Sequence, residues 1–161
     1  MKNLFLVRHA KSSWQAPLND SDRPLTQSGI KDSHLVSSMA KAFLPKAYII
    51  WSSKAKRACE TALIFAQNFS YPVENILFRD DLYTFDEKDL QKVIQSCPDE
   101  IDNLILFGHN EAITNFVNTF GTVYIDNVPT SGFMSISFDS NSWKFLKKGV
   151  TNKTIFPRDL R

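Results

Sequence analysis

Short apolar runs alternate along the chain with segments in which apolar residues recur at helical spacing. The runs cover residues 4–7, 47–51, 76–78 and 104–107, and runs of this length are typical of strands buried on both faces. Between them, i, i+3, i+4, i+7 spacing predicts helices around Val36, Met39, Ala40 and Phe43, around Leu90, Val93, Ile94 and Cys97, and around Ile113, Phe116, Val117 and Phe120.

Residues with capping or helix-breaking chemistry predict where the first two helices begin and end. Thr26 can cap the first helix, and Pro45 ends it. Ser52 and Ser53 are expected to cap a second helix that runs to about Asn68.

The last third of the chain changes its pattern. Residues 134–138 alternate between apolar and polar side chains, and a turn at 139–141 precedes residues 143–146, which predicts an antiparallel hairpin at one edge of the sheet. The basic stretch 144–148 is expected to be a strand with solvated lysines. Because strands alternate with helices elsewhere, we expect an α/β fold in which residues 1–161 form a single domain. Its architecture would be a three-layer α/β/α sandwich with a mostly parallel central sheet and an antiparallel edge.

Composition restricts the class of protein further. Of the 161 residues, 43% are apolar and 13 are phenylalanines, which is enough for a sizeable core. The net charge of +2 is too small to indicate nucleic-acid binding, which favours a clustered basic face. No apolar run approaches the roughly 20 residues that span a bilayer, and the N-terminus lacks the features of a signal peptide. We therefore expect a cytoplasmic protein with no membrane partner, in which Cys59 and Cys97 are free thiols.

Basic and polar residues follow three of the predicted strands. Arg8 and His9 follow the first, Arg57 lies a few residues beyond the second, and His109 and Asn110 come shortly after the fourth. Ligands of open α/β sheets bind beyond the carboxyl ends of the strands. We therefore expect these side chains to share one site, although each taken singly could be a surface cation or a structural histidine.

Two arginines and two histidines together suit phosphoryl transfer. A phosphomonoester is a dianion whose oxygens match the guanidinium fork. A neutral imidazole is a competent nucleophile at pH 7, because its unperturbed pKa is about 6.5. Attack by one histidine would form a phosphohistidine intermediate that water then hydrolyses.

Zinc binding is the main alternative chemistry for the histidines. His9 and His109 could ligate zinc together with nearby carboxylates. Two guanidinium groups, however, create a positive pocket that attracts an anion and repels a cation. The chain also lacks the His-Glu-x-x-His and Cys-x-x-Cys spacings. The sequence therefore favours a phosphate site with no metal and no other cofactor.

Four sequence blocks, in order, resemble the histidine phosphatase superfamily, whose fold is phosphoglycerate-mutase-like. They are residues 8–14 (Arg-His-Ala-Lys-Ser-Ser-Trp), 22–26 with Gly29 (Asp-Arg-Pro-Leu-Thr), 52–62 (Ser-Ser-x-x-x-Arg-Ala-x-x-Thr-Ala) and 108–110 (Gly-His-Asn). Most of the superfamily has glycine where this chain has Ala10. With alanine at this position, the chain resembles the branch of small phosphohistidine phosphatases of the SixA type.

The resemblance implies a metal-independent phosphatase in which His9 is the phospho-accepting nucleophile. Arg8, Arg57 and His109 would complete the phosphate pocket. The SixA-like branch implies a phosphorylated substrate that is itself a protein phosphohistidine. Two alternatives stay open: a phosphatase of a small phosphorylated metabolite, with the same machinery, and a non-catalytic phosphate-binding module. The two intact histidines argue against the second alternative.

Further roles are less defined by the resemblance. Ser12 would be an auxiliary phosphate contact or an ordinary loop hydroxyl, and Asn110 would offer its backbone amide or cap the next helix. Many family members carry a glutamate general acid in a long insertion, but here Thr84 stands at that place and no insertion forms a lid. Asp86 and Glu87 are candidates, or simply acids favoured by a helix dipole. Because a phosphoramidate leaves as a nearly neutral imidazole, it needs less help from an acid than an alkoxide does.

Overall fold

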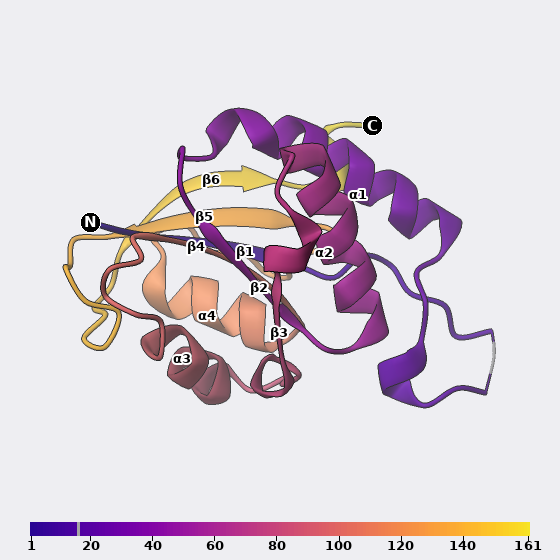
Figure 1. Cartoon of the computed structure of the whole chain (residues 1–161), viewed down its shortest axis with the longest axis horizontal. Coiled ribbons are helices and arrows are strands. Elements are labelled where there is room, and N and C mark those ends of the chain that lie inside the picture. Colours follow the sequence, from indigo (N-terminus) through magenta and orange to yellow (C-terminus); the bar gives the residue numbers. More distant parts are fainter. Residues whose placement is uncertain (16) are drawn as a thin grey trace.

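The centre of the computed structural model, which describes residues 1–15 and 17–161, is one mixed β-sheet. Within these residues its strand order is β3-β2-β4-β1-β5-β6 (Figure 1). The six strands are β1 (Lys2–Arg8), β2 (Ile49–Ser53), β3 (Leu77–Arg79), β4 (Asn103–Gly108), β5 (Phe133–Phe138) and β6 (Val150–Ile155).

The four strands β3, β2, β4 and β1 run parallel, and β5 runs antiparallel to both of its neighbours. The β5–β6 pair forms one edge of the sheet, so the prediction of an antiparallel edge is confirmed. β1 is buried on both faces. Because successive side chains of a strand point in opposite directions, its apolar residues enter the core on both sides of the sheet. Leu4 and Leu6 enter one core cluster, and Phe5 and Val7 enter the other.

Four α-helices cover the two faces of the sheet within the described residues (Figure 1). One face packs against α1 (Gln27–Ala40) and α2 (Lys56–Phe69), and the other against α3 (Glu87–Gln95) and α4 (Ala112–Phe120). Thr26 caps α1 as predicted, because its side chain accepts a hydrogen bond from the amide of Gly29. The predicted three-layer α/β/α sandwich is therefore confirmed.

Ser52 and Ser53 do not cap the second helix, contrary to the prediction. Both lie in β2, whereas α2 begins at Lys56 with Ala55 at its N-cap position and no side-chain cap. Pairing with β3 extends the strand through both serines, and their side chains are fully buried. Ser53 Oγ accepts a hydrogen bond from the amide of Ala55 at 3.2 Å.

The apolar face predicted for the first helix is only half correct. Val36 and Ala40 are fully buried, but Met39 is 46% exposed and Phe43 is 43% exposed. The α-helix ends at Ala40, and a 3₁₀ turn over Lys41–Phe43 changes the angular spacing of the residues that follow. Small side chains at positions 33 and 37 complete the buried face instead.

The second strand of the C-terminal hairpin lies later in the chain than predicted. Residues 143–146 form no strand, since Trp143 is buried in the core and its indole N–H donates to the carbonyl oxygen of Ile101 at 2.6 Å. The basic stretch 144–148 is consequently a loop rather than a strand. The apolar residues of the 143–146 segment resemble a strand in sequence, although the side chain of Trp143 enters the core from an irregular segment.

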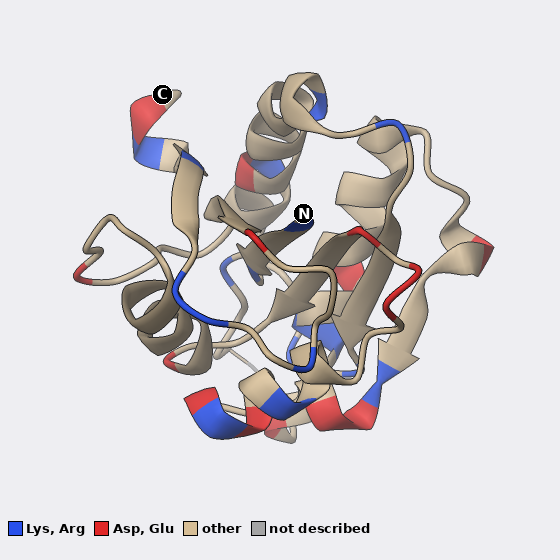
Figure 2. Cartoon of the chain, turned by 90° about the vertical axis from the view of Figure 1, so that its left-hand side faces the viewer, with Lys and Arg blue, Asp and Glu red and all other residues tan. Residues whose placement is uncertain are grey.

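The surface carries charges of both signs. Figure 2 shows Lys and Arg interspersed with Asp and Glu on the face that it presents. Among the described residues, no helix has the length and apolar character that a bilayer crossing requires.

Candidate active site

Two histidines meet at the carboxyl ends of β1 and β4. Arg8 pairs with Gly108 in the parallel register, so His9 and His109 directly follow the paired ends of neighbouring strands. The amide of His9 donates to the carbonyl oxygen of Gly108 at 3.1 Å, and the two imidazole centroids are 5.2 Å apart. The sheet topology thus brings together two residues from distant parts of the sequence.

Hydrogen bonding holds the ring of His9 in one tautomer. Its Nδ1 lies 2.7 Å from the carbonyl oxygen of Ala10, which can only accept, so Nδ1 carries the proton. Nε2 therefore carries the lone pair, and Arg57 Nε donates to it at 3.4 Å. The amide of Ala10 donates in turn to Thr61 Oγ1 at 2.9 Å, which fixes the segment that orients the ring.

Arg57 is held rigidly beside His9. It is the second residue of α2, and its side chain is almost fully buried. Nη1 donates to the backbone carbonyl oxygen of Asp20 at 2.7 Å, and Nη2 donates to Asp20 Oδ2 at 3.0 Å. The guanidinium group therefore faces His9 on one side and Asp20 on the other.

Three buried side-chain atoms lack a hydrogen-bond partner among the described residues, and two of them belong to this site. These two are Arg8 Nε and His109 Nδ1, and the third is Ser131 Oγ. Arg8 is anchored through Nη1, which donates to the carbonyl oxygen of Val128 at 2.9 Å, and His109 Nε2 lies 2.8 Å from Ser53 Oγ. Because unpaired buried polar atoms are rare in folded proteins, their clustering here indicates a place for a polar ligand.

Both histidines are neutral at pH 7. Burial, followed by the charges of Arg57, Arg8 and Arg23, lowers the pKa of His9 to about 4, although its hydrogen bond to the Ala10 carbonyl opposes the shift. Burial, followed by the proximity of His9 and Arg57, lowers the pKa of His109 to about 3. His9 therefore presents an uncharged nitrogen at physiological pH.

Ser12 and Asn110 line the same cavity as His9, but both side chains already have protein partners. Ser12 Oγ accepts a hydrogen bond from Arg23 Nη1 at 2.7 Å. Asn110 Oδ1 accepts from the amide and the hydroxyl of Thr114, at 3.1 and 2.9 Å, and so supports the first turn of α4. The side chain of Asn110 therefore stabilises the start of α4, as in the second of its two expected roles.

The cavity beside His9 has a volume of about 360 Å³ and contains an acid that sequence reasoning missed. Asp20 Oδ1 accepts from Arg23 Nε at 3.2 Å, and Oδ2 accepts from Arg57 and from the hydroxyl of Tyr83. The Tyr83 and Arg57 bonds lower the pKa of Asp20 to about 2. Asp20 and Arg23 reach the cavity from a short 3₁₀ helix (Asp20–Asp22) and the residue that follows it, so a search limited to strand ends could not find them. The available signal was the 22–26 block that resembles the family, since it contains Arg23 and begins two residues after Asp20.

The two acids considered as proton donors lie at the start of α3. Asp86 caps this helix by accepting a hydrogen bond from the amide of Lys88 at 3.3 Å. The carboxylate of Glu87 accepts from the hydroxyl of Thr119. Neither residue is part of the described lining of the cavity at His9, so both act at the helix N-terminus.

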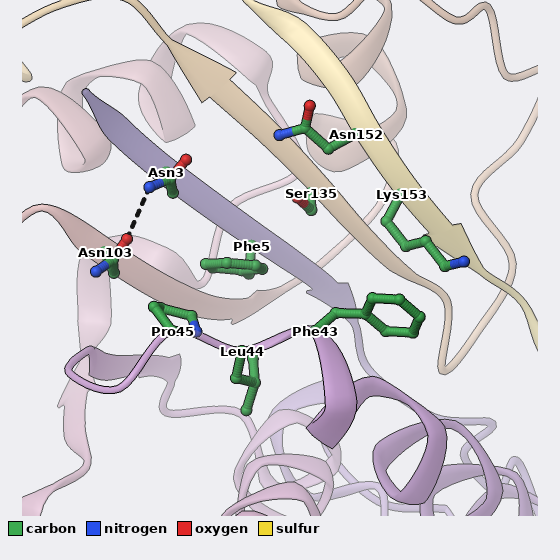
Figure 3. Close-up of a pocket in the computed structure, with 9 residues that line it drawn as sticks. All are labelled: Asn3, Phe5, Phe43, Leu44, Pro45, Asn103, Ser135, Asn152 and Lys153. Atoms are coloured by element: carbon green, nitrogen blue, oxygen red, sulfur yellow. Dashed lines mark hydrogen bonds between the residues drawn. The ribbon is translucent and has the colours of Figure 1, made fainter.

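A larger cavity, of about 560 Å³, lies at the opposite end of the sheet (Figure 3). Asn3 and Asn103, near the amino ends of β1 and β4, line it, and Asn3 Nδ2 donates to Asn103 Oδ1 at 2.9 Å. Its described lining includes none of the candidate site residues. Because ligands of such sheets bind at the carboxyl ends of the strands, the smaller cavity is the candidate active site.

A model of the histidine phosphatase superfamily, branch 1, matches residues 4–124. This range spans three quarters of the chain and includes Arg8, His9, Arg57 and His109. The chain belongs to the histidine phosphatase superfamily. The resemblance drawn from the four sequence blocks is therefore confirmed.

One curated protein is similar in sequence to this chain. An uncharacterized chloroplastic protein of Arabidopsis thaliana is 33% identical over 120 residues, which cover 68% of this chain and 55% of the relative. The chain thus spans about half the length of the curated relative that it matches.

Solved structures share the fold of the whole chain. The protein histidine phosphatase SixA complexed with tungstate matches with a TM-score of 0.79 at 20% identity, covering 99% of both chains. A candidate phosphohistidine phosphatase SixA from Agrobacterium tumefaciens matches with a TM-score of 0.78 at 21% identity, covering 96% of this chain and 97% of that one. The fold is therefore SixA-like.

Proposed function

We propose that this protein is a phosphatase that removes the phosphoryl group from phosphohistidine residues of proteins, without a metal, through a phosphorylated His9. One observation carries the proposal. The lone pair of a neutral His9 Nε2 lies among buried cationic and unpartnered polar groups at the carboxyl ends of two parallel strands. A nucleophile among donors for an anion is what phosphoryl transfer requires.

The donors around His9 suit the three oxygens of a phosphoryl group. Arg8 offers its unpartnered Nε, and His109 offers Nδ1 when the Ser53 hydroxyl donates to Nε2. Arg57 offers Nη2 once the carboxylate of Asp20 yields it to the ligand, and Nη1 once the backbone carbonyl of Asp20 does. A fold relative that binds tungstate, an oxyanion shaped like phosphate, supports this assignment.

The reaction runs in two displacements at phosphorus. His9 Nε2 attacks, the bond from phosphorus to the substrate nitrogen breaks, and the departing imidazole takes a proton from solvent. Water then attacks the phosphohistidine, giving inorganic phosphate and free His9. No acid of this chain other than Asp20 lines the described cavity, and its pKa of about 2 leaves it without a proton to donate. A substrate with a good leaving group, such as phosphohistidine, fits this arrangement better than an alkyl ester.

The donor set also favours metal-independent chemistry. The charges of Arg57, Arg8 and Arg23 act on His9, and the same charges repel a cation. Within the described part of the chain, no three His, Cys, Asp or Glu side chains gather as ligands for a metal. Turnover that is unchanged by a chelator is the expected result.

The nucleophile is tested by substitution and by trapping. His9→Ala should reduce turnover to background, and an alkaline quench of the wild-type enzyme during turnover should trap phosphate on the peptide that contains His9. His34→Ala is the matched control, because His34 lies in α1 outside the described lining of the cavity. Full turnover by His9→Ala would contradict the mechanism.

The substrate class is tested by comparison. The wild-type enzyme should hydrolyse a phosphohistidine peptide with a higher kcat/KM than alkyl phosphomonoesters. A strong preference for the alkyl esters would instead support a phosphatase of small metabolites.

A further inference from the structure

Two exposed aromatic rings border the cavity that contains His9. Trp14 lies in the loop after β1, and Phe85 lies in the loop before α3, so the rings come from separate segments. Trp14 is 76% exposed and Phe85 is 53% exposed. Neither ring is needed to bind phosphate, which is recognised by charge and hydrogen bonds. Exposed apolar surface that borders a ligand site can contact the ligand.

The ring of Trp14 is held in place from one side. The guanidinium carbon of Arg23 lies 3.5 Å from the centroid of the ring. Arg23 is itself buried, and it donates to Ser12 and to Asp20. The amide of Ser13 further ties the segment to the carbonyl oxygen of Pro24 at 2.8 Å. The indole is therefore an oriented surface whose other face is available to a ligand.

The ring of Phe85 is fixed by edge-to-face contacts. Its centroid lies 5.8 Å from that of Tyr83, with an interplanar angle of 81°, and 5.5 Å from that of His109, with an angle of 70°. Both contacts have the geometry that aromatic pairs prefer. Phe85 thus links the mouth of the cavity directly to the second histidine of the site.

The position of the leaving group follows from the direction of attack. Phosphoryl transfer places the attacking and leaving atoms roughly in line through phosphorus. His9 is buried, whereas Trp14 and Phe85 line the same cavity with exposed rings, so a leaving group that points away from His9 Nε2 toward solvent would extend toward these rings. A flat leaving group would stack there against carbon surfaces that are already oriented.

We propose that Trp14 and Phe85 form a subsite for the imidazole ring of the substrate phosphohistidine. This inference rests on the proposed function, because it assigns the leaving group of that reaction to the two rings. The imidazole is planar and aromatic, so it can stack on an indole or a phenyl ring. The two rings are therefore specificity-determining residues that act on the leaving group and not on the phosphoryl oxygens.

The test compares two substrates that share the P–N bond. Phosphohistidine contains the ring, and phosphoramidate lacks it. The measured quantity is the ratio of kcat/KM for phosphohistidine to kcat/KM for phosphoramidate. Trp14→Leu and Phe85→Leu should each lower this ratio about fivefold, because one aromatic contact is lost while apolar bulk remains. Trp14→Phe, which keeps a ring, should restore most of the ratio.

Phe145→Leu is the matched control, since Phe145 is 77% exposed in a loop outside the described lining of the cavity. It should leave the ratio unchanged.

If the wild-type enzyme hydrolyses both compounds but neither leucine variant changes the ratio, the subsite is refuted and the proposed function stands. The imidazole assignment would also be refuted if the leucine variants lost activity only on nucleoside monophosphates and kept their full activity on phosphohistidine. If the wild-type enzyme hydrolyses neither P–N compound, the proposed function fails and the inference fails with it.

Discussion

Acidification from pH 7 to pH 5 should destabilise this protein through its two buried histidines. In an unfolded chain, each histidine binds a proton with a pKa of about 6.5. In the folded protein, the pKa is about 4 for His9 and about 3 for His109. At a pH between the folded and the unfolded pKa values, the unfolded state binds more protons than the folded state. The free energy of unfolding therefore decreases as the pH falls.

The size of the effect depends mainly on the unfolded chain. Above pH 5 both folded histidines stay neutral, so the loss is insensitive to how far each pKa is lowered. At about 1.4 kcal/mol per pH unit for each histidine below pH 6.5, the loss at pH 5 is about 2 kcal/mol for one and about 4 kcal/mol for both. That is a large part of the roughly 5–15 kcal/mol by which domains are stable.

Urea unfolding followed by tryptophan fluorescence at pH 7, 6 and 5 measures this dependence. His9→Asn should remove about half of it, because one of the two titrating groups is gone. His34→Gln should retain all of it, since the side chain of His34 is exposed and pairs only with Asn68 in the described structure. A urea midpoint that does not change between pH 7 and pH 5 would refute the argument that both imidazoles are buried without charge.

Two other substitutions test contacts that position the site. Asp20→Asn removes the negative charge that pairs with Arg57 Nη2. Inhibition by inorganic phosphate should therefore strengthen about fivefold, as expected for the loss of one partly exposed ion pair. An unchanged inhibition constant would show that Asp20 does not compete with the anion. Gly29→Ala would place a Cβ 2.3 Å from the carbonyl oxygen of Lys11, so α1 must shift and stability should fall by about 2 kcal/mol. The exposed neighbouring change Gln27→Ala serves as its control in urea unfolding, and equal midpoints for the two variants would rule out the close approach.

Local patterns along the chain were sufficient to predict the layers of the fold. Buried parallel strands require apolar residues on both faces, so residues 4–7 and 104–107 were recognisable without any knowledge of their partners. The same logic failed at residues 143–146, where Trp143 packs into the core from a loop. It also failed at Ser53, a polar residue that pairing with β3 keeps in a strand.

The sequence by itself determined that Arg8 and His9 come at the end of one strand and that His109 comes just after another, because each position follows from a local apolar run. Only the tertiary structure decided what surrounds them. The carbonyl of Ala10 selects the tautomer of His9, and Asp20 engages Arg57. These are contacts of single atoms. The first depends on the backbone conformation just after β1, and the second joins residues distant in sequence, so it depends on how the helices and loops pack against the sheet. Spacing along the chain carries no record of that packing.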